Sequence, residues 1–228
     1  MKRFYSHVSV AADNSILLDG KQIKTPAKAD LIAPTRALGD AIAQEWREQG
    51  AEIWPATMFL TKLANTAIDR VEPLREAFLR ELADYARSDL LCYRANEPAA
   101  LASRQQAGWD PLLDWAQARF GAALKVTHGV RPVAQDGESV AALTRPLHDC
   151  DRWRLAALQS ATTLTGSLIL ALALADGRLD ASQAFELSRI DETFQAENWG
   201  RDAEAAERAN RLQAELKAAA RFLDLARS

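Results

Sequence analysis

The longest uncharged stretch of the chain, residues 155–175, constrains the fold most strongly. About 20 apolar residues are enough to cross a bilayer as a helix. This stretch is diluted, however, by hydroxyl and amide side chains: Gln159, Ser160, Thr162, Thr163, Thr165 and Ser167. Only residues 168–175 are strongly apolar, a length typical of a buried helix. We therefore predict one core helix over residues 152–175, no stable membrane insertion, and other helices packed around it.

The overall composition is that of a globular protein. Hydrophobic residues make up 48% and charged residues 26% of the 228 residues, which is enough apolar material for a core. A net charge of −3 gives no long-range attraction to nucleic acid or anionic lipid. The six tryptophans do not alternate with basic residues, so we expect no nucleic-acid binding. Cys92 and Cys150 lie far apart, which suits buried thiols in a reducing compartment.

The first residues carry no recognisable targeting signal. Residues 1–5 have neither the apolar centre of a signal peptide nor the Arg/Ser-rich amphipathic pattern of a presequence. We therefore expect a cytoplasmic bacterial protein. A mature mitochondrial protein trimmed of its leader would look the same, and its compartment would be the matrix.

Residues 4–32 are predicted to form β structure. Val8 and Val10 alternate with polar neighbours, which is the period of a half-buried strand. Asp19-Gly20 lies between two strand-like runs and predicts a tight hairpin, because both residues tolerate positive φ. Leu31 and Ile32 suggest a further short strand. These signals predict a small β-rich domain over residues 1–56.

Helical periodicity dominates the remainder, which predicts a larger, mostly α-helical domain over residues 57–228 and an α+β fold. Thr35 is a suitable N-cap for the first helix. A long helix over residues 99–120 is expected to break at Asp110-Pro111, because the residue before proline avoids the helical region. Further helices are expected at 139–148, 180–199 and 202–226. The segment 121–137 is predicted to be a loop, with a strand from Leu124, Val126 and Val130.

Motifs for common enzymatic chemistry are missing from the sequence. It contains no G-x-S-x-G, no P-loop and no G-x-G-x-x-G. His148, Asp149, Cys150 and Asp151 are consecutive, so on a helix they would point in different directions instead of converging on a metal. We expect no metal, no cofactor and no catalytic residue.

Asp191, Glu192, Glu197 and Trp199 form the one polar cluster that merits a functional hypothesis. The simplest interpretation is a solvated helix face. A second is a recognition surface, because tryptophan is enriched at binding hot spots. A third is a small-molecule enzyme using carboxylates within residues 191–202, which would need a pocket with convergent polar groups and shifted pKa values. A peripheral membrane protein is a fourth. Spacing does not decide among them.

Seven segments of the sequence, taken together and in their order along the chain, resemble those of a known family. They are residues 18–26 (LDGKQIKTP), 45–46 (EW), 60–69 (LTKLANTAID), 88–94 (SDLLCYR), 109–116 (WDPLLDWA), 187–195 (LSRIDETFQ) and 199–200 (WG). Jointly they resemble the chaperone family that serves the alpha subunit of F-type ATP synthase in mitochondria and alphaproteobacteria. The resemblance implies a non-enzymatic chaperone that holds the free alpha subunit and covers the surface that the beta subunit later takes.

The resemblance also implies where the partner binds. The functionally important acidic residue of the family is matched by Glu192, with Asp191 beside it and Trp199 closing the motif; we add Glu197 to this predicted surface. Mitochondrial relatives often carry His-Asp after the Trp-Gly pair, whereas this chain continues with Arg201, which favours a bacterial member. We expect Glu192 to contact an arginine or lysine of the partner.

Overall fold

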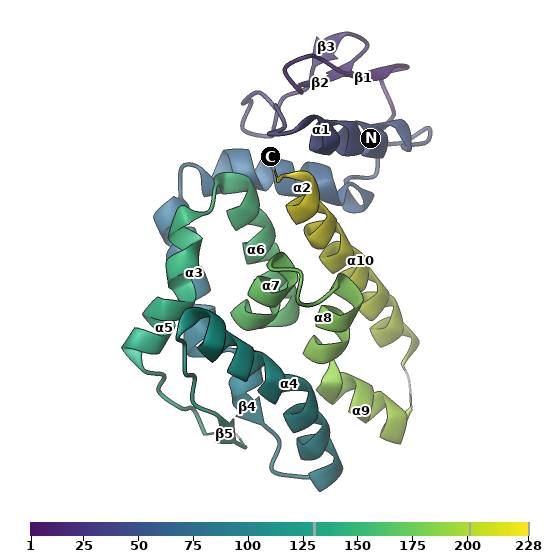
Figure 1. Cartoon of the computed structure of the whole chain (residues 1–228). Helices are drawn as coiled ribbons and strands as arrows, with labels where there is room; N and C mark the ends of the chain where they lie inside the picture. The colour runs from purple at the N-terminus through teal and green to yellow at the C-terminus, as the bar shows by residue number, and fades with distance from the viewer. Residues whose placement is uncertain (130, 201, 228) are drawn as a thin grey trace. The chain divides into compact units, whose positions relative to one another are not determined.

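The computed structural model describes residues 1–129, 131–200 and 202–227, which form two compact units (Figure 1). Unit 1 contains residues 1–75, 150–157 and 218–228, and unit 2 contains residues 76–149 and 158–217. Short strands come first and helices dominate afterwards, so the predicted α+β class is confirmed. Each unit combines segments that are distant in sequence. The division into domains 1–56 and 57–228 stays a prediction.

Unit 1 begins with a three-stranded antiparallel sheet in the order β1 (Val8–Val10), β2 (Ile16–Leu18), β3 (Lys21–Gln22). Leu18 pairs with Lys21, so Asp19 and Gly20 form a two-residue turn with φ of 47° and 78°. Positive φ at both positions gives the turn a twist that matches the strands, and the predicted hairpin is confirmed. The strand expected at Leu31–Ile32 is reduced to an isolated bridge between Ser15 and Ile32.

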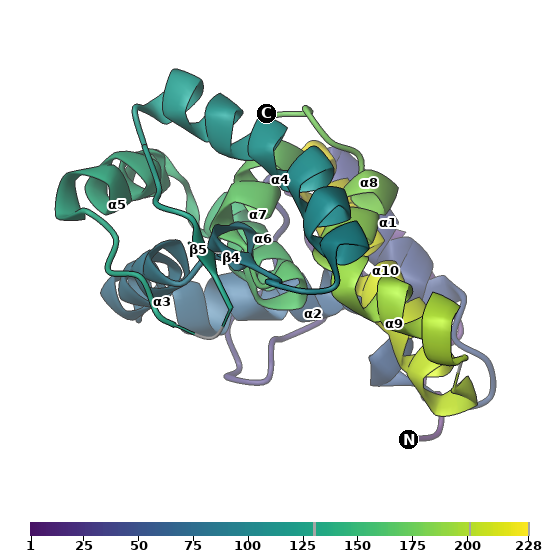
Figure 2. The ribbon, with the colours of Figure 1, turned by 90° about the horizontal axis from the view of Figure 1, so that it is seen from below.

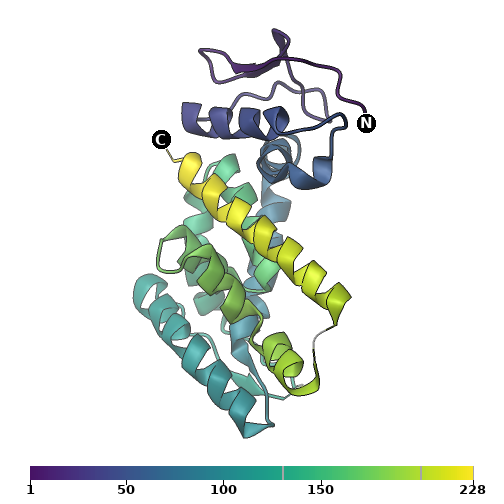
Figure 3. The same cartoon turned by 90° about the vertical axis from the view of Figure 1, so that its right-hand side faces the viewer.

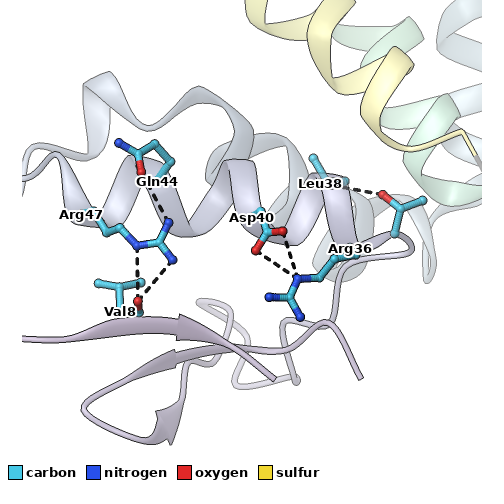
Figure 4. Close-up of polar contacts among 7 residues, drawn as sticks. Val8, Arg36, Leu38, Asp40, Gln44 and Arg47 are labelled. Atoms are coloured by element: carbon cyan, nitrogen blue, oxygen red, sulfur yellow. Dashed lines mark hydrogen bonds and ion pairs between the residues drawn. The ribbon is translucent and has the colours of Figure 1, made fainter. Parts of the chain in front are cut away.

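Helix α1 (Arg36–Arg47) covers this sheet through its apolar face. The Thr35 hydroxyl accepts a hydrogen bond from the Leu38 N–H at 3.1 Å, as predicted for an N-cap. At the other end, the Arg47 guanidinium donates to the Val8 carbonyl, with distances of 3.3 and 3.2 Å from Nε and Nη2 (Figure 4). Arg36 pairs with Asp40 on the exposed side. Both ends of the helix are therefore fixed by polar contacts.

A carboxylate from α1 caps the next helix of unit 1. The turn η1 (Pro55–Thr57) leads to α2 (Phe59–Thr66), whose N-cap residue Met58 has no capping side chain. Glu45 supplies the acceptors instead: its oxygens accept from the N–H groups of Leu60 at 2.7 Å and Thr61 at 2.8 Å. Burial raises the pKa of Glu45 despite these bonds. The π-helical turn η2 (Ala67–Val71) follows directly.

The remaining elements are mostly helical. In order they are α3 (Arg75–Arg87), η3 (Leu90–Cys92), β4 (Tyr93–Arg94), α4 (Ala99–Phe120), β5 (Thr127–His128), α5 (Gly137–Thr144), η4 (Arg145–Asp149), α6 (Arg152–Thr165), α7 (Leu168–Ala175), α8 (Ala181–Ser188), α9 (Ile190–Trp199) and α10 (Ala203–Leu225). β4 and β5 pair in parallel, so the strand predicted near residues 124–130 exists only at Thr127–His128. Val130 lies outside the described residues. Among the helices described, none combines the length and apolarity needed to cross a membrane.

Two predictions about single, continuous helices are wrong. The uncharged stretch forms two helices, because Gly166 adopts a left-handed φ of 71° and Ser167 caps α7 by accepting from the Leu170 N–H at 3.0 Å. The expected helix 180–199 is likewise divided, between α8 and α9, at Arg189, whose φ of −120° and ψ of 22° are not helical.

The break expected at Asp110-Pro111 is also wrong, because α4 runs unbroken from Ala99 to Phe120. Proline removes one hydrogen bond and crowds the preceding turn. Tertiary bonds hold that turn in place: the Trp109 indole donates to the Leu187 carbonyl at 2.8 Å, and Asp110 accepts from Arg94 at 2.8 Å. Contacts with other elements thus outweigh the local preference.

A buried carboxylate in unit 2 holds the division between α6 and α7. Asp89 is 0% exposed. It accepts hydrogen bonds from the Ser167 hydroxyl at 2.7 Å and from the N–H groups of Ile169 and Leu91, both at 3.1 Å. The Leu90 N–H donates to the Gly166 carbonyl at 3.1 Å. Burial raises the pKa of Asp89 to about 6, although the hydrogen bonds act in the opposite direction.

The raised pKa of Asp89 predicts a pH-dependent stability. A carboxyl whose pKa is higher in the folded than in the unfolded protein stabilises the fold most when the pH is below its ordinary pKa. This stabilisation is lost as the pH rises through the pKa of the folded protein. Raising the pH from 4 to 6 ionises Asp89 and should lower the free energy of unfolding by about 3 kcal/mol. The free energy of unfolding of Asp89→Asn should not show this decrease between pH 4 and 6. Urea denaturation at a series of pH values would measure it.

Asp114→Asn provides the control, because Asp114 is an exposed acid on α4. Its pH profile should follow that of the unmodified chain. Identical profiles for Asp89→Asn and the unmodified chain would contradict this account of the buried carboxyl.

Candidate partner-binding site

Helix α9 positions the four predicted site residues in unit 2. Ile190 and Phe194, four positions apart, are its buried residues, and they define one apolar face. This face packs near Gly108 of α4, where an added Cβ would come within 2.9 Å of Leu187 and 3.0 Å of Ile190. The absence of a side chain at Gly108 therefore allows the helices to approach closely. The polar residues of α9 take the other directions.

Asp191 is part of a hydrogen-bonded chain that links α9 to α4. Its Oδ1 accepts from the Gln105 amide at 2.6 Å. Gln105 is almost fully buried, and its Oε1 accepts from the Ala95 N–H at 2.7 Å. Because buried amide groups need partners, Asp191 serves the packing of this region. Its carboxylate therefore already has a partner on α4.

Glu197 also faces α4, although in a more exposed setting. It forms an ion pair with Arg104 at 2.8 Å, and both side chains remain nearly half exposed. The Arg104 guanidinium lies 5.4 Å from the centre of the Phe194 ring. Figure 2 shows α9 beside α4. An exposed ion pair of this kind contributes about 0–1 kcal/mol to stability. Glu197 therefore stabilises the contact between α9 and α4 only weakly.

Glu192 lies on a different side of α9, where residues of α8, α9 and the first turns of α10 line a groove of about 240 Å³. Figure 3 shows the backbone of α10 and the shorter helix α9. Glu192 pairs with Arg189 at 2.8 Å, and 48% of its side chain is exposed. Most of the surface that lines the groove is apolar, and four of the lining residues are alanines. The lining includes Phe185, Thr193, Ala196, Ala205, Ala206 and Ala209, together with the polar residues Asp202 and Asn210. The result is a shallow apolar groove with charged groups at its rim.

Trp199 is the most exposed large hydrophobic side chain reported in the described part of the chain, at 76%. It ends α9, and Gly200 follows with a φ of 94°. Arg201 lies outside the described residues. Asp202 then caps α10, since its carboxylate oxygens accept from the N–H groups of Glu204 and Ala205, both at 3.3 Å.

The structure thus separates the predicted residues into two groups. Asp191 and Glu197 turn towards α4, whereas Glu192 lies at the groove and Trp199 ends the same helix in solvent. The predicted partner-binding residues do not include Arg189 or the alanines of the groove, and Asp202 enters only through the enzyme alternative. The i, i+4 spacing of Ala205 and Ala209 on the helix that starts at Ala203 is the sequence signal for this wall.

The arrangement does not gather carboxylates for acid–base chemistry. Of the acids within residues 191–202, Glu192 and Asp202 line the groove, while Asp191 and Glu197 have partners on α4. Across residues 1–129, 131–200 and 202–227, no three His, Cys, Asp or Glu side chains come together as a metal site. Burial raises the pKa of the Cys92 thiol to about 12, which keeps it protonated.

The chain is thus an α+β protein with an apolar groove that is flanked by charged groups. Comparisons with known proteins identify the class more closely. The family model described as "ATP12 chaperone protein" matches residues 2–117. The crystal structure of Atp12 from Paracoccus denitrificans is similar, with a TM-score of 0.91 and 44% identity, covering 99% of this chain and 98% of that one.

Two further relatives extend the comparison. The Atu1473 protein from Agrobacterium tumefaciens has a TM-score of 0.92 and 42% identity, over 98% of this chain and 85% of that chain. The mitochondrial protein atp12 of Schizosaccharomyces pombe is 23% identical over 214 residues, which are 87% of this chain and 74% of that protein. The chain belongs to the ATP12 chaperone family.

The different surroundings of Asp191 and Glu192 predict different effects on stability. Asp191→Ala would leave the buried Gln105 amide without its acceptor and should lower the free energy of unfolding by about 2 kcal/mol. Glu192→Ala removes an exposed ion pair and should change it by less than about 0.5 kcal/mol. Urea denaturation of both variants measures the difference. Equal losses would show that the two neighbours have the same structural role.

Proposed function

We propose that this chain binds the unassembled alpha subunit of the F-type ATP synthase through the groove formed by α8, α9 and α10. The chaperone role in ATP synthase assembly follows from membership of the family; the alpha subunit as partner, and the groove as its binding site, are the proposal. The bacterial cytoplasm and the mitochondrial matrix are the corresponding compartments. The single observation that carries the proposal is the position of Glu192 at the rim of an apolar groove.

The exposed ion pair at Glu192 leaves its carboxylate available to a partner. Arg189 and Glu192 are three positions apart on the surface, and such pairs stabilise a helix by only a few tenths of a kcal/mol. A lysine or arginine of the partner can therefore share the carboxylate at little cost. When desolvated, a charge-assisted contact of this kind contributes about 1.5–3 kcal/mol.

The surroundings of Glu192 supply the apolar part of the binding surface. The alanines of α9 and α10 leave room above the groove for a partner side chain. Trp199 offers a large exposed aromatic surface on the same helix as Glu192, and tryptophans of this kind commonly become binding hot spots. An acidic group, an apolar groove and an exposed aromatic residue together suit a partner surface that is apolar with a basic rim.

A placeholder role explains why such binding would assist assembly. A subunit that awaits its neighbour exposes apolar surface, and exposed apolar surface promotes aggregation. A chaperone that covers this surface and leaves when the beta subunit arrives would prevent aggregation without changing the final complex. No catalysis is required for this exchange.

Charge reversal at Glu192 tests the proposal. Glu192→Lys places a cation opposite the proposed basic rim and should reduce recovery of the co-expressed alpha subunit by about tenfold or more on size-exclusion chromatography. Circular dichroism should remain unchanged, because the original ion pair is exposed. Asp114→Lys, at an exposed acid of α4, is the matched control and should retain binding.

Two outcomes would contradict the proposal for Glu192. Unfolding of Glu192→Lys by circular dichroism would make the residue structural. Full retention of the alpha subunit by a folded Glu192→Lys variant would place the binding surface elsewhere.

Filling the groove provides a second, uncharged test. Ala206→Trp should occupy the groove and weaken alpha-subunit binding by about tenfold, as expected when an apolar contact surface is blocked. Ala214→Trp is the matched control, because Ala214 is an exposed alanine of the same helix outside the groove. Pull-down of the alpha subunit at a series of concentrations would compare the two. Equal binding by both variants would exclude the groove.

A further inference from the structure

The groove at Glu192 has two walls whose lining residues follow helix faces. The α9 wall consists of Arg189, Glu192, Thr193 and Ala196. The α10 wall consists of Asp202, Ala205, Ala206, Ala209 and Asn210. Each set starts at the residue that precedes its helix and continues at i+3, i+4 and i+7, which is one side of a helix over two turns. Each wall is therefore about 10 Å long.

The α10 wall is helical but almost uncovered. From residue 202 to residue 215 no side chain is buried, and Leu216 is the first buried residue of α10. Residues 203–209 are all alanine, glutamate or arginine, which are strong helix formers. The wall can therefore remain helical without a covering element. Because it is already ordered, little conformational entropy is lost when a partner binds to it.

The composition of the walls favours a helical occupant over an extended one. All described lining residues except Arg189 and Asp202 lie within α8, α9 or α10, whose backbone N–H and C=O groups bond mainly within their own helix. An extended segment would therefore leave many of its own polar groups unpaired against alanine side chains. A helix satisfies its own backbone groups, and the small side chains of both walls allow its axis to come close.

The charges around the groove favour a basic residue on the occupant. Among the described lining residues, Glu192 and Asp202 are acidic and Arg189 is basic. Arg189 pairs with Glu192 at 2.8 Å, whereas Asp202 accepts only from backbone N–H groups at the start of α10 in the hydrogen bonds described above. One negative charge of the lining is therefore not balanced by a lining cation, and a lysine or arginine of a partner would complement it.

We propose that the groove receives an amphipathic helix of the alpha subunit. Its apolar side chains, at i, i+3 or i+4 and i+7, would lie between the two walls, with a lysine or arginine beside Glu192 or Asp202. The identity of the partner rests on the proposed function, whereas the helical form of the bound segment follows from the walls of the groove. Two to three helical turns match walls of about 10 Å.

Peptides that tile the alpha subunit test this proposal. Labelled peptides of about 18 residues, or roughly five helical turns, are titrated with the full chain and followed by fluorescence anisotropy. At least one peptide should bind saturably, and it should carry the apolar spacing given above beside a lysine or arginine. A proline at its centre should weaken binding by about tenfold or more, because proline interrupts a helix. A proline at its first helical position is the control and should be tolerated.

Variants of the chain test whether the peptide contacts both walls at once. Thr193→Trp on α9 and Ala206→Trp on α10 should each weaken peptide binding by about tenfold. Gln195→Trp and Ala214→Trp are the matched controls, because these exposed residues lie on the same two helices outside the groove. Circular dichroism should show that all four variants remain folded.

The outcomes separate the helical occupant from the identity of the partner. If the full-length alpha subunit binds and is weakened by Ala206→Trp, but no peptide binds, the helix is wrong and the proposed function remains. A bound peptide that tolerates a central proline, or that is weakened by a change at one wall alone, would also overturn the helix. If a peptide binds as expected while the full-length alpha subunit does not, the proposed function is wrong and the groove still takes a helix. Absence of binding by both would overturn both.

Discussion

The buried carboxylate of Asp89 is the contact on which unit 2 depends most. It accepts hydrogen bonds from the Ser167 hydroxyl and the Ile169 N–H at the start of α7. It also accepts from the N–H of Leu91 in its own turn. A carboxylate deep in the core is costly unless it is fully hydrogen-bonded. These bonds tie the segment that leads into β4 to the most apolar helix of the chain. Through β4 they also position Arg94 beside α4.

Acids that cap a neighbouring element recur in unit 1. Asp19 accepts from the N–H groups of Ser6 and His7, Glu45 caps α2, and Asp69 accepts from the Thr25 hydroxyl and the Ala27 N–H. Asp19, Glu45, Asp69 and Asp89 all lie in segments that carry the family resemblance. Four of the resembling segments therefore each contribute an acid that caps another part of the chain. The segment that ends at Trp199 is different, because it places Glu192 and the tryptophan at the surface.

Local signals predicted the parts of the fold that local chemistry decides. Asp19-Gly20 and Thr35 specified a turn and an N-cap with their own backbone and side-chain preferences. The division at Gly166 and the continuity through Pro111 were missed, because Asp89, Trp109 and Arg94 act there from distant segments. The resemblance correctly identified the family, and sequence placed Glu192 and Trp199 on one helix. The groove could not be predicted from the segment around Glu192, because α10 and its N-cap Asp202 contribute half of the residues that line it.

The central claim is that the chaperone holds its partner with the surface around Glu192. Hydrogen–deuterium exchange of the chain, with and without the alpha subunit, tests this most directly. The account predicts slower exchange across residues 185–200 and 202–210 in the complex, and its reversal when the beta subunit is added. Unchanged exchange in these segments, with protection confined to unit 1 or to β4 and β5, would contradict it.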